Sequence, residues 1–110
     1  MGRKSYAPAF IAAALEPYAH RLGDKLGRSV PGDFIDNEGD YGWGLAWSET
    51  LDARYRERYG RDIRLWLPLS VDRDSEGLFA RARWEWFDLV SDIYAETFRA
   101  VTDWHEARGM

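Results

Sequence analysis

The last third of the chain carries the pattern that most restricts its fold. Between Ser75 and Arg108, apolar residues recur every three or four positions, and charged residues recur at the same spacing on the other side, among them Arg81, Glu85, Asp88 and Asp92. This pattern predicts one long amphipathic helix of about 50 Å at 1.5 Å per residue. A second apolar strip widens the face that must be covered, and it consists of Trp84, Phe87, Tyr94 and Phe98. Such a helix needs more partner surface than the short elements predicted elsewhere in the chain.

The N-terminal region predicts another helix, over Ala9–Leu26. Its apolar residues recur every four positions, at Phe10, Ala14, Tyr18, Leu22 and Leu26. Pro17 interrupts this pattern, so it either kinks the helix or marks the first turn of its second half. Gly27 follows at the position expected for a C-cap.

The stretch from Val30 to Trp47 predicts a strand followed by an acidic loop. The residues between Gly27 and Gly39 favour a strand near Pro31–Asp36. Acids then gather where the strand gives way to a glycine-rich loop, at Asp36, Glu38 and Asp40, and aromatic residues follow at Tyr41, Trp43 and Trp47. Clustered acids repel one another and contribute nothing to a core, so this stretch is a candidate functional site. The alternative is a solvated turn.

Capping residues define the middle of the chain. Ser48 is placed as the N-cap of a helix that runs through Tyr59 and is closed by Gly60. Asp62 is placed to cap a further turn, Ile63–Leu67, which Pro68 ends. The polar residues 70–77 predict a loop that is too short for a domain linker.

The composition argues against several classes of function. The chain has 110 residues, enough for one ordinary domain or part of a larger one. Its net charge is −4, with arginines dispersed among acids, whereas a nucleic-acid surface needs a basic patch. No apolar run approaches the length of a membrane span, and no signal peptide is visible at the start. We therefore expect no nucleic acid and no membrane as partner, and a cytoplasmic location only if Met1 is the true start.

Metal and cofactor signatures are weak. The chain has no cysteine, and its two histidines, His20 and His105, are far apart with no second ligand at metal spacing. The alternation of Asp36, Glu38 and Asp40 resembles the start of a calcium loop, but the glycine and the closing glutamate of such a loop are misplaced. No phosphate loop or dinucleotide fingerprint is present. We expect neither a metal nor a cofactor.

Three long segments carry a resemblance to a known family. They are FIAAALEPYAHRLGDKLGRSVPGDFIDNEG, TLDARYRERYGRDIRLWLPLS and ARARWEWFDLVSDIYAETFRAVTDWHEARGM. In this order they resemble a part of glycoside hydrolases of the α-L-rhamnosidase and β-galactosidase-like TIM-barrel type, which need about 250 residues. The resemblance implies an α-dominated α/β fold, helix–strand–helix–long helix, similar to a partial (β/α)8 barrel. It also implies that residues 1–110 form a single unit that belongs to a larger catalytic domain.

The resemblance extends to a set of site residues. In the family the strand ends in Asp-Glu-Pro, whereas this chain has Asp36-Asn37-Glu38. Asp36 matches, and the catalytic glutamate falls on Asn37 or, shifted by one, on Glu38. We expect Glu38 to be the general acid and Asp36 its partner or a ligand of sugar hydroxyls, because glycoside hydrolysis requires paired carboxylates. The residues expected to bind the carbohydrate are Asn37, Asp40, Tyr41, Trp43 and Trp47.

Two functions of different classes follow from the sequence. The first is a segment of a glycoside hydrolase that cleaves glycosidic bonds by carboxylate acid–base chemistry and is inactive in isolation. The second is a small helical interaction or assembly module without catalytic activity, in which the acidic loop is only solvated. In the first case the rest of the enzyme covers the Ser75–Arg108 helix, and otherwise this helix mediates self-association.

Overall fold

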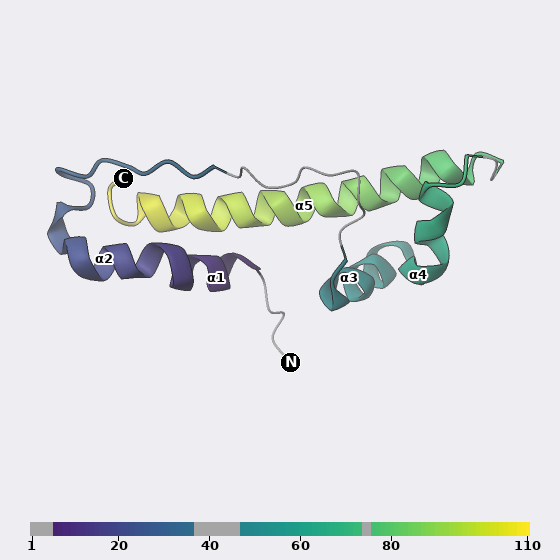
Figure 1. Cartoon of the computed structure of the whole chain (residues 1–110), viewed down its shortest axis with the longest axis horizontal. Helices are drawn as coiled ribbons and strands as arrows, with labels where there is room; N and C mark the ends of the chain where they lie inside the picture. Colours follow the sequence, from purple (N-terminus) through teal and green to yellow (C-terminus); the bar gives the residue numbers. More distant parts are fainter. Residues whose placement is uncertain (1–5, 37–46, 74–75) are drawn as a thin grey trace. The chain divides into compact units, whose positions relative to one another are not determined.

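The structure, a computed structural model, describes residues 6–36, 47–73 and 76–110 (Figure 1). Its α-helices are α1 (Tyr6–Phe10), α2 (Glu16–Leu22), α3 (Glu49–Tyr59), α4 (Ile63–Trp66) and α5 (Leu78–Glu106). A π-helical turn (Ile11–Leu15) and two 3-10 turns (Gly23–Lys25 and Leu67–Ser70) complete the regular structure. The described residues fall into two compact units, which we call the terminal unit (6–36 and 95–110) and the central unit (47–73 and 76–94). Helix α5 contributes residues to both units.

The predicted strand near Pro31–Asp36 is wrong, and with it the α/β fold and the partial (β/α)8 barrel. In the three described ranges the chain is helical and has no strand or sheet. Residues 31–36 lack regular secondary structure, and a nearby isolated bridge between Leu26 and Val30 lies within a local turn. The physical reason is that a strand is stabilised by hydrogen bonds to a neighbouring strand. Pro31 also lacks the N–H that such pairing needs.

The predicted N-terminal helix is present as three consecutive segments. Helix α1 passes into the π-helical turn and then into α2, where Pro17 lies in the first turn. Proline has no N–H to donate, and the first turn of a helix is where this loss costs least, so the second alternative for Pro17 is confirmed. The C-cap of α2 is Gly23, with a φ of +53°, and not Gly27 as predicted.

Contacts between α2 and the end of α5 hold the terminal unit together (Figure 1). The Glu16 carboxylate accepts hydrogen bonds from the Trp104 indole at 2.7 Å and from the Arg108 guanidinium at 3.1 Å. The same guanidinium lies over the Trp104 ring, 3.9 Å from its centroid, in a cation–π contact. Because Trp104 and Leu15 are buried beside this cluster of charges, the two helices are fixed by both apolar and polar contacts.

Replacing Gly27 with alanine is expected to lower the free energy of unfolding of the terminal unit by about 2–4 kcal/mol, from backbone strain and overpacking together. Gly27 has a φ of +74°, and a Cβ atom added there would lie 2.3 Å from the Arg108 carbonyl oxygen. The matched control is Gly60→Ala, which has a φ of +69° but open space around the added Cβ, so only about 1 kcal/mol of strain is expected. Urea denaturation measures both losses, and equal losses would contradict the predicted clash.

The three caps predicted for the central unit are confirmed. The Ser48 hydroxyl accepts a hydrogen bond from the Leu51 N–H at 3.2 Å and so begins α3. Gly60, in the left-handed conformation, ends this helix. The Asp62 carboxylate accepts the Arg64 N–H at 2.9 Å and begins α4. Each cap satisfies a backbone group that the helix itself leaves without a partner.

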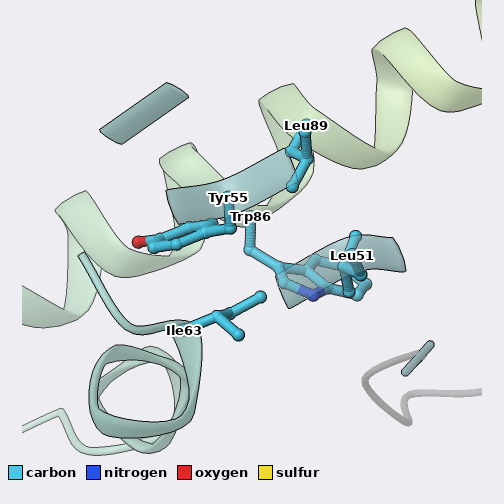
Figure 2. Close-up of a cluster of buried hydrophobic side chains, with 5 residues drawn as sticks. All are labelled: Leu51, Tyr55, Ile63, Trp86 and Leu89. Carbon is cyan, nitrogen blue, oxygen red and sulfur yellow. The ribbon is translucent and has the colours of Figure 1, made fainter. Parts of the chain in front are cut away.

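The core of the central unit lies where α3, α4 and α5 meet (Figure 2). Five buried side chains form it, namely Leu51, Tyr55, Ile63, Trp86 and Leu89. On α3 and α5 the core residues lie three or four positions apart, so they share one face of each helix. Partly buried side chains extend this core, and they are Tyr59, Trp66, Leu67, Val90 and Ile93.

The prediction of a long C-terminal helix is confirmed. Helix α5 begins at Leu78 and ends at Glu106, and Gly109 follows with a φ of +73°. The polar segment 70–77 was predicted to be a loop. Its described residues include the end of a 3-10 turn at Ser70 and contain no α-helix. None of the helices in the described ranges has both the length and the apolar character needed to cross a membrane.

Candidate functional site

Of the predicted site residues, the structure describes Asp36 and Trp47. The others, Asn37, Glu38, Asp40, Tyr41 and Trp43, lie outside the described residues. Asp36 belongs to the terminal unit and Trp47 to the central unit. Trp47 is half exposed and lines an open hollow with Arg64, Leu67, Pro68 and Val71. Each of the two residues is therefore described within its own unit, and the candidate site is built from Asp36, which lines the larger hollow of the two.

Asp36 lines a cavity of about 500 Å³ in the terminal unit. The walls come from α1, the π-helical turn, α2, residues 30–36 and the end of α5. Asp33 and Asp36 supply carboxylates to a lining that is otherwise mostly apolar and includes Phe10, Tyr18, Leu22, Phe34 and Trp104. Small-molecule sites in proteins commonly have this size and this mixture of apolar walls with a few polar groups.

Two contacts hold the segment that leads to Asp36. The Nε2 atom of His105 lies 2.8 Å from a carboxylate oxygen of Asp33, which ties the segment to α5. Upstream, the Gly27 N–H donates to the Val30 carbonyl oxygen at 2.9 Å and closes the turn that starts the segment. The cavity wall that carries Asp36 is thus positioned by residues of the same unit.

The wall beside Asp36 presents apolar groups to solvent. The Phe34 side chain is 88% exposed, and Ile35 is 45% exposed. A flat aromatic ring can stack on the C–H face of a sugar ring while neighbouring carboxylates accept its hydroxyl protons. Carboxylates can also donate or accept a proton during bond cleavage. Among the described residues, no group of three or more His, Asp or Glu side chains is placed to hold a metal ion.

The central unit contains a buried ionic cluster that the sequence did not reveal. Glu85, predicted on the charged side of α5, is only 2% exposed. Its carboxylate accepts hydrogen bonds from the Tyr55 hydroxyl at 2.5 Å, from Arg81 Nε at 2.9 Å and from the Arg61 guanidinium. The Arg61 guanidinium also lies 4.5 Å from the centre of the Trp66 ring. Both charges of the Arg61–Glu85 pair are therefore compensated.

A second tyrosine–acid pair lies beside the first. The Tyr59 hydroxyl donates to Asp88 at 2.5 Å, and Arg58 pairs with Asp88 at 2.6 Å and also with Asp92. Burial and the adjacent carboxylates raise the pKa of Tyr55 and of Tyr59 above the usual value, so both hydroxyls remain donors at alkaline pH values at which a free tyrosine ionises. The two pairs join α3 to α5. The sequence signal for them is the tyrosine spacing of four on one helix and the acid spacing of three on the other.

The second apolar strip of α5 is exposed. In the central unit, Trp84 is 63% exposed, Phe87 48% and Tyr94 59%. In the terminal unit, Phe98 is 65% exposed. The central unit thus uses one apolar face of α5 for its core and presents another to solvent.

Comparisons with known proteins give no assignment. No protein-family model matches the chain, and neither a curated protein nor a solved structure matches it significantly. The resemblance to glycoside hydrolases, the hydrolytic activity and the carbohydrate partner therefore stay predictions.

Proposed function

We propose that this chain is a segment of a glycoside hydrolase and that Asp36 contributes to its carbohydrate site. The observation that carries the proposal is the position of Asp36, in the wall of a cavity of about 500 Å³ that aromatic side chains also line. The three sequence segments that resemble this enzyme class support it. Glycoside hydrolysis needs one carboxylic acid to protonate the leaving oxygen and a second carboxylate to act as base or nucleophile.

In this proposal Glu38 is the acid and Asp36 its partner, or Asp36 binds a sugar hydroxyl. Asp36 ends the segment that the contact between Asp33 and His105 ties to α5. Glu38 comes two residues later in the sequence. The neighbouring negative charge of Asp36 would disfavour ionisation of Glu38. A general acid must stay protonated near neutral pH, so this effect suits the proposed role. The isolated chain is then expected to bind sugars weakly and to show no turnover.

Sugar binding by the isolated chain tests the role of Asp36. We expect L-rhamnose or D-galactose to perturb the tryptophan fluorescence of the chain in a saturable way, because Trp104, one of its six tryptophans, lines the cavity. Asp36→Asn should weaken this binding by about 10-fold or more, the usual effect of removing a hydrogen bond to a charged group. The matched control is Asp24→Asn, an exposed carboxylate of the same unit that pairs with Arg28 at 3.9 Å. Equal binding by both variants, or no saturable binding by the unmodified chain, would contradict the proposal.

A second candidate function is a helical assembly module. The observation that favours it is that α5 is apolar on two faces in the central unit, one buried against α3 and α4 and one exposed. A contiguous exposed apolar face commonly marks a surface that another protein covers. Sugar binding that depends on Asp36 separates the first function from this one.

A further inference from the structure

The exposed face of α5 has the spacing of a helix–helix seam. Trp84 and Phe87 lie three positions apart, Ser91 follows four positions later, and Tyr94 three positions after that. This is the alternation of three and four that defines the a and d positions of a coiled coil, maintained over two heptads. All four side chains are exposed.

These positions face away from the core. At 100° per residue they fall within roughly 80° of one another on the helix surface. The core residues of the same helix, Trp86 and Leu89, fall roughly on the opposite side. Residues of α3 and α4 therefore cover one side of α5 in the central unit and leave the Trp84–Tyr94 strip to solvent.

We propose that the strip formed by Trp84, Phe87, Ser91 and Tyr94 is the interface of a homodimer in which the α5 helices of two copies pack antiparallel. An antiparallel pair has two-fold symmetry, the commonest symmetry of protein dimers, and requires a strip that is complementary to itself. The strip meets this requirement. With Phe87 of one copy beside Ser91 of the other, Trp84 of the first copy comes beside Tyr94 of the second.

The sizes of the side chains favour this register. The large ring of Phe87 meets the small side chain of Ser91, and this contact occurs twice by symmetry. Alternation of large and small side chains across facing positions lets two helices approach closely without overlap. A parallel pair would place Trp84 against Trp84 and Ser91 against Ser91, which crowds one layer and leaves a gap in the other.

The charges beside the strip permit the approach of a second copy. Asp88 lies next to the strip, but Arg58 pairs with it at 2.6 Å and pairs with Asp92 as well. Arg83, on the other flank, lies 5.3 Å from the centre of the Phe87 ring in a cation–π contact. The flanks therefore carry charges of both signs, and salt is expected to have little effect on association.

The exposed area sets the expected strength. An aromatic side chain buries roughly 150–250 Å² when fully covered, so three half-exposed rings supply roughly 350 Å² per copy, or roughly 700 Å² for both copies. Stable specific interfaces start at about 1,200 Å², and the remainder must come from the flanking side chains. We therefore expect a weak dimer that dissociates reversibly on dilution, as transient interfaces below this size do.

Sedimentation equilibrium of the 110-residue chain tests the interface. Trp84→Gln and Tyr94→Gln should each weaken dimerisation by at least about 10-fold, because central aromatic side chains dominate small interfaces. The matched control is Leu65→Gln on α4, an apolar side chain that is 78% exposed outside the strip, and it should leave dimerisation unchanged. Circular dichroism confirms that each variant keeps its helices. A monomer at all concentrations, open-ended oligomers or an equal effect of Leu65→Gln would overturn the proposal.

The direction of packing is tested by a distance between two spin labels. The chain has no cysteine, so Leu78→Cys provides one attachment site per copy, at the start of α5. In the antiparallel register the two labels lie roughly 33 Å apart along the helix axis, at 1.5 Å per residue. In a parallel pair they lie about one interhelical distance apart, roughly 10 Å. Dipolar spectroscopy distinguishes the two, and the short distance would overturn the antiparallel dimer. Neither experiment depends on sugar binding, so the proposed glycosidase function can fail without affecting this result.

Discussion

Replacing Glu85 with alanine is expected to lower the free energy of unfolding of the central unit by about 3–5 kcal/mol, the usual cost of breaking a buried ion pair. The Glu85 carboxylate is buried and accepts hydrogen bonds from the Tyr55 hydroxyl, Arg61 and Arg81. Alanine leaves the Tyr55 hydroxyl without this acceptor inside the core and leaves the Arg61 charge without its partner. Urea denaturation followed by circular dichroism measures the loss.

Two further variants show whether the loss comes from the ionic cluster. Glu106→Ala removes an exposed glutamate of the same helix and should change the stability by less than about 0.5 kcal/mol. Glu85→Gln keeps the shape of the side chain but removes its charge. Burial is the largest cause of the raised pKa of Tyr55, and the hydrogen bond and charge of Glu85 come next. The pKa of Tyr55 should therefore fall toward its usual value in this variant. An ultraviolet titration of tyrosine measures this change. A loss below about 1 kcal/mol in Glu85→Ala would show that the cluster contributes little.

Local patterns in the sequence predicted the helices well because their causes are local. Ser48, Gly60 and Asp62 act on backbone groups within four residues, and the structure places all three as caps. The long period of α5 likewise depends only on residues of one helix. For Pro17 the sequence left two alternatives open, and the structure shows the second, with Pro17 in the first turn of α2.

Apart from the C-cap of α2, which is Gly23 and not Gly27, the errors concern features that need a distant partner. Phe34 and Ile35 favour a strand, but strand pairing requires a second strand, which the described residues do not provide. Glu85 sits on the charged side of α5 in the sequence pattern, and its burial depends on Tyr55 and Arg61 from another part of the chain. The spacing of these residues along each helix does not show which helices face each other.

The sequence singled out Asp36 as an acid where a predicted strand gives way to a loop. The strand is absent, and Asp36 lines a cavity whose role stays a prediction. The apolar side chains that form most of this cavity come from the N-terminal helices and from the end of α5. The sequence shows the helical ones among these residues only as parts of apolar helix faces, because a cavity wall and a core face have the same apolar pattern along a helix.

Replacing Glu38 with glutamine is expected to lower turnover by at least about 100-fold on substrates with poor leaving groups, the usual contribution of acid–base assistance. This prediction follows from the proposed function and applies to the natural protein that carries this chain. Glutamine has nearly the shape of glutamic acid but cannot donate the proton that the leaving oxygen needs. The loss should be much smaller on activated aryl glycosides, because their leaving groups depart with little protonation. Steady-state kinetics on both substrate types measure the difference.

The pattern of losses across variants identifies which carboxylate is the acid. Glu49→Gln, at the start of α3 and outside the predicted site, is the control and should leave turnover unchanged on both substrate types. If Glu38→Gln instead lowers turnover modestly and equally on both substrate types, Glu38 has only a structural role. Asp36 is then the candidate acid, and Asp36→Asn tests it in the same assay. If the replaced residue is the general acid, the loss of turnover must differ between the two substrate types, since only the poor leaving group depends on the proton. Replacing a residue that binds sugar hydroxyls should lower turnover or raise KM to the same extent on both substrate types. The ratio between substrates therefore separates proton donation from binding.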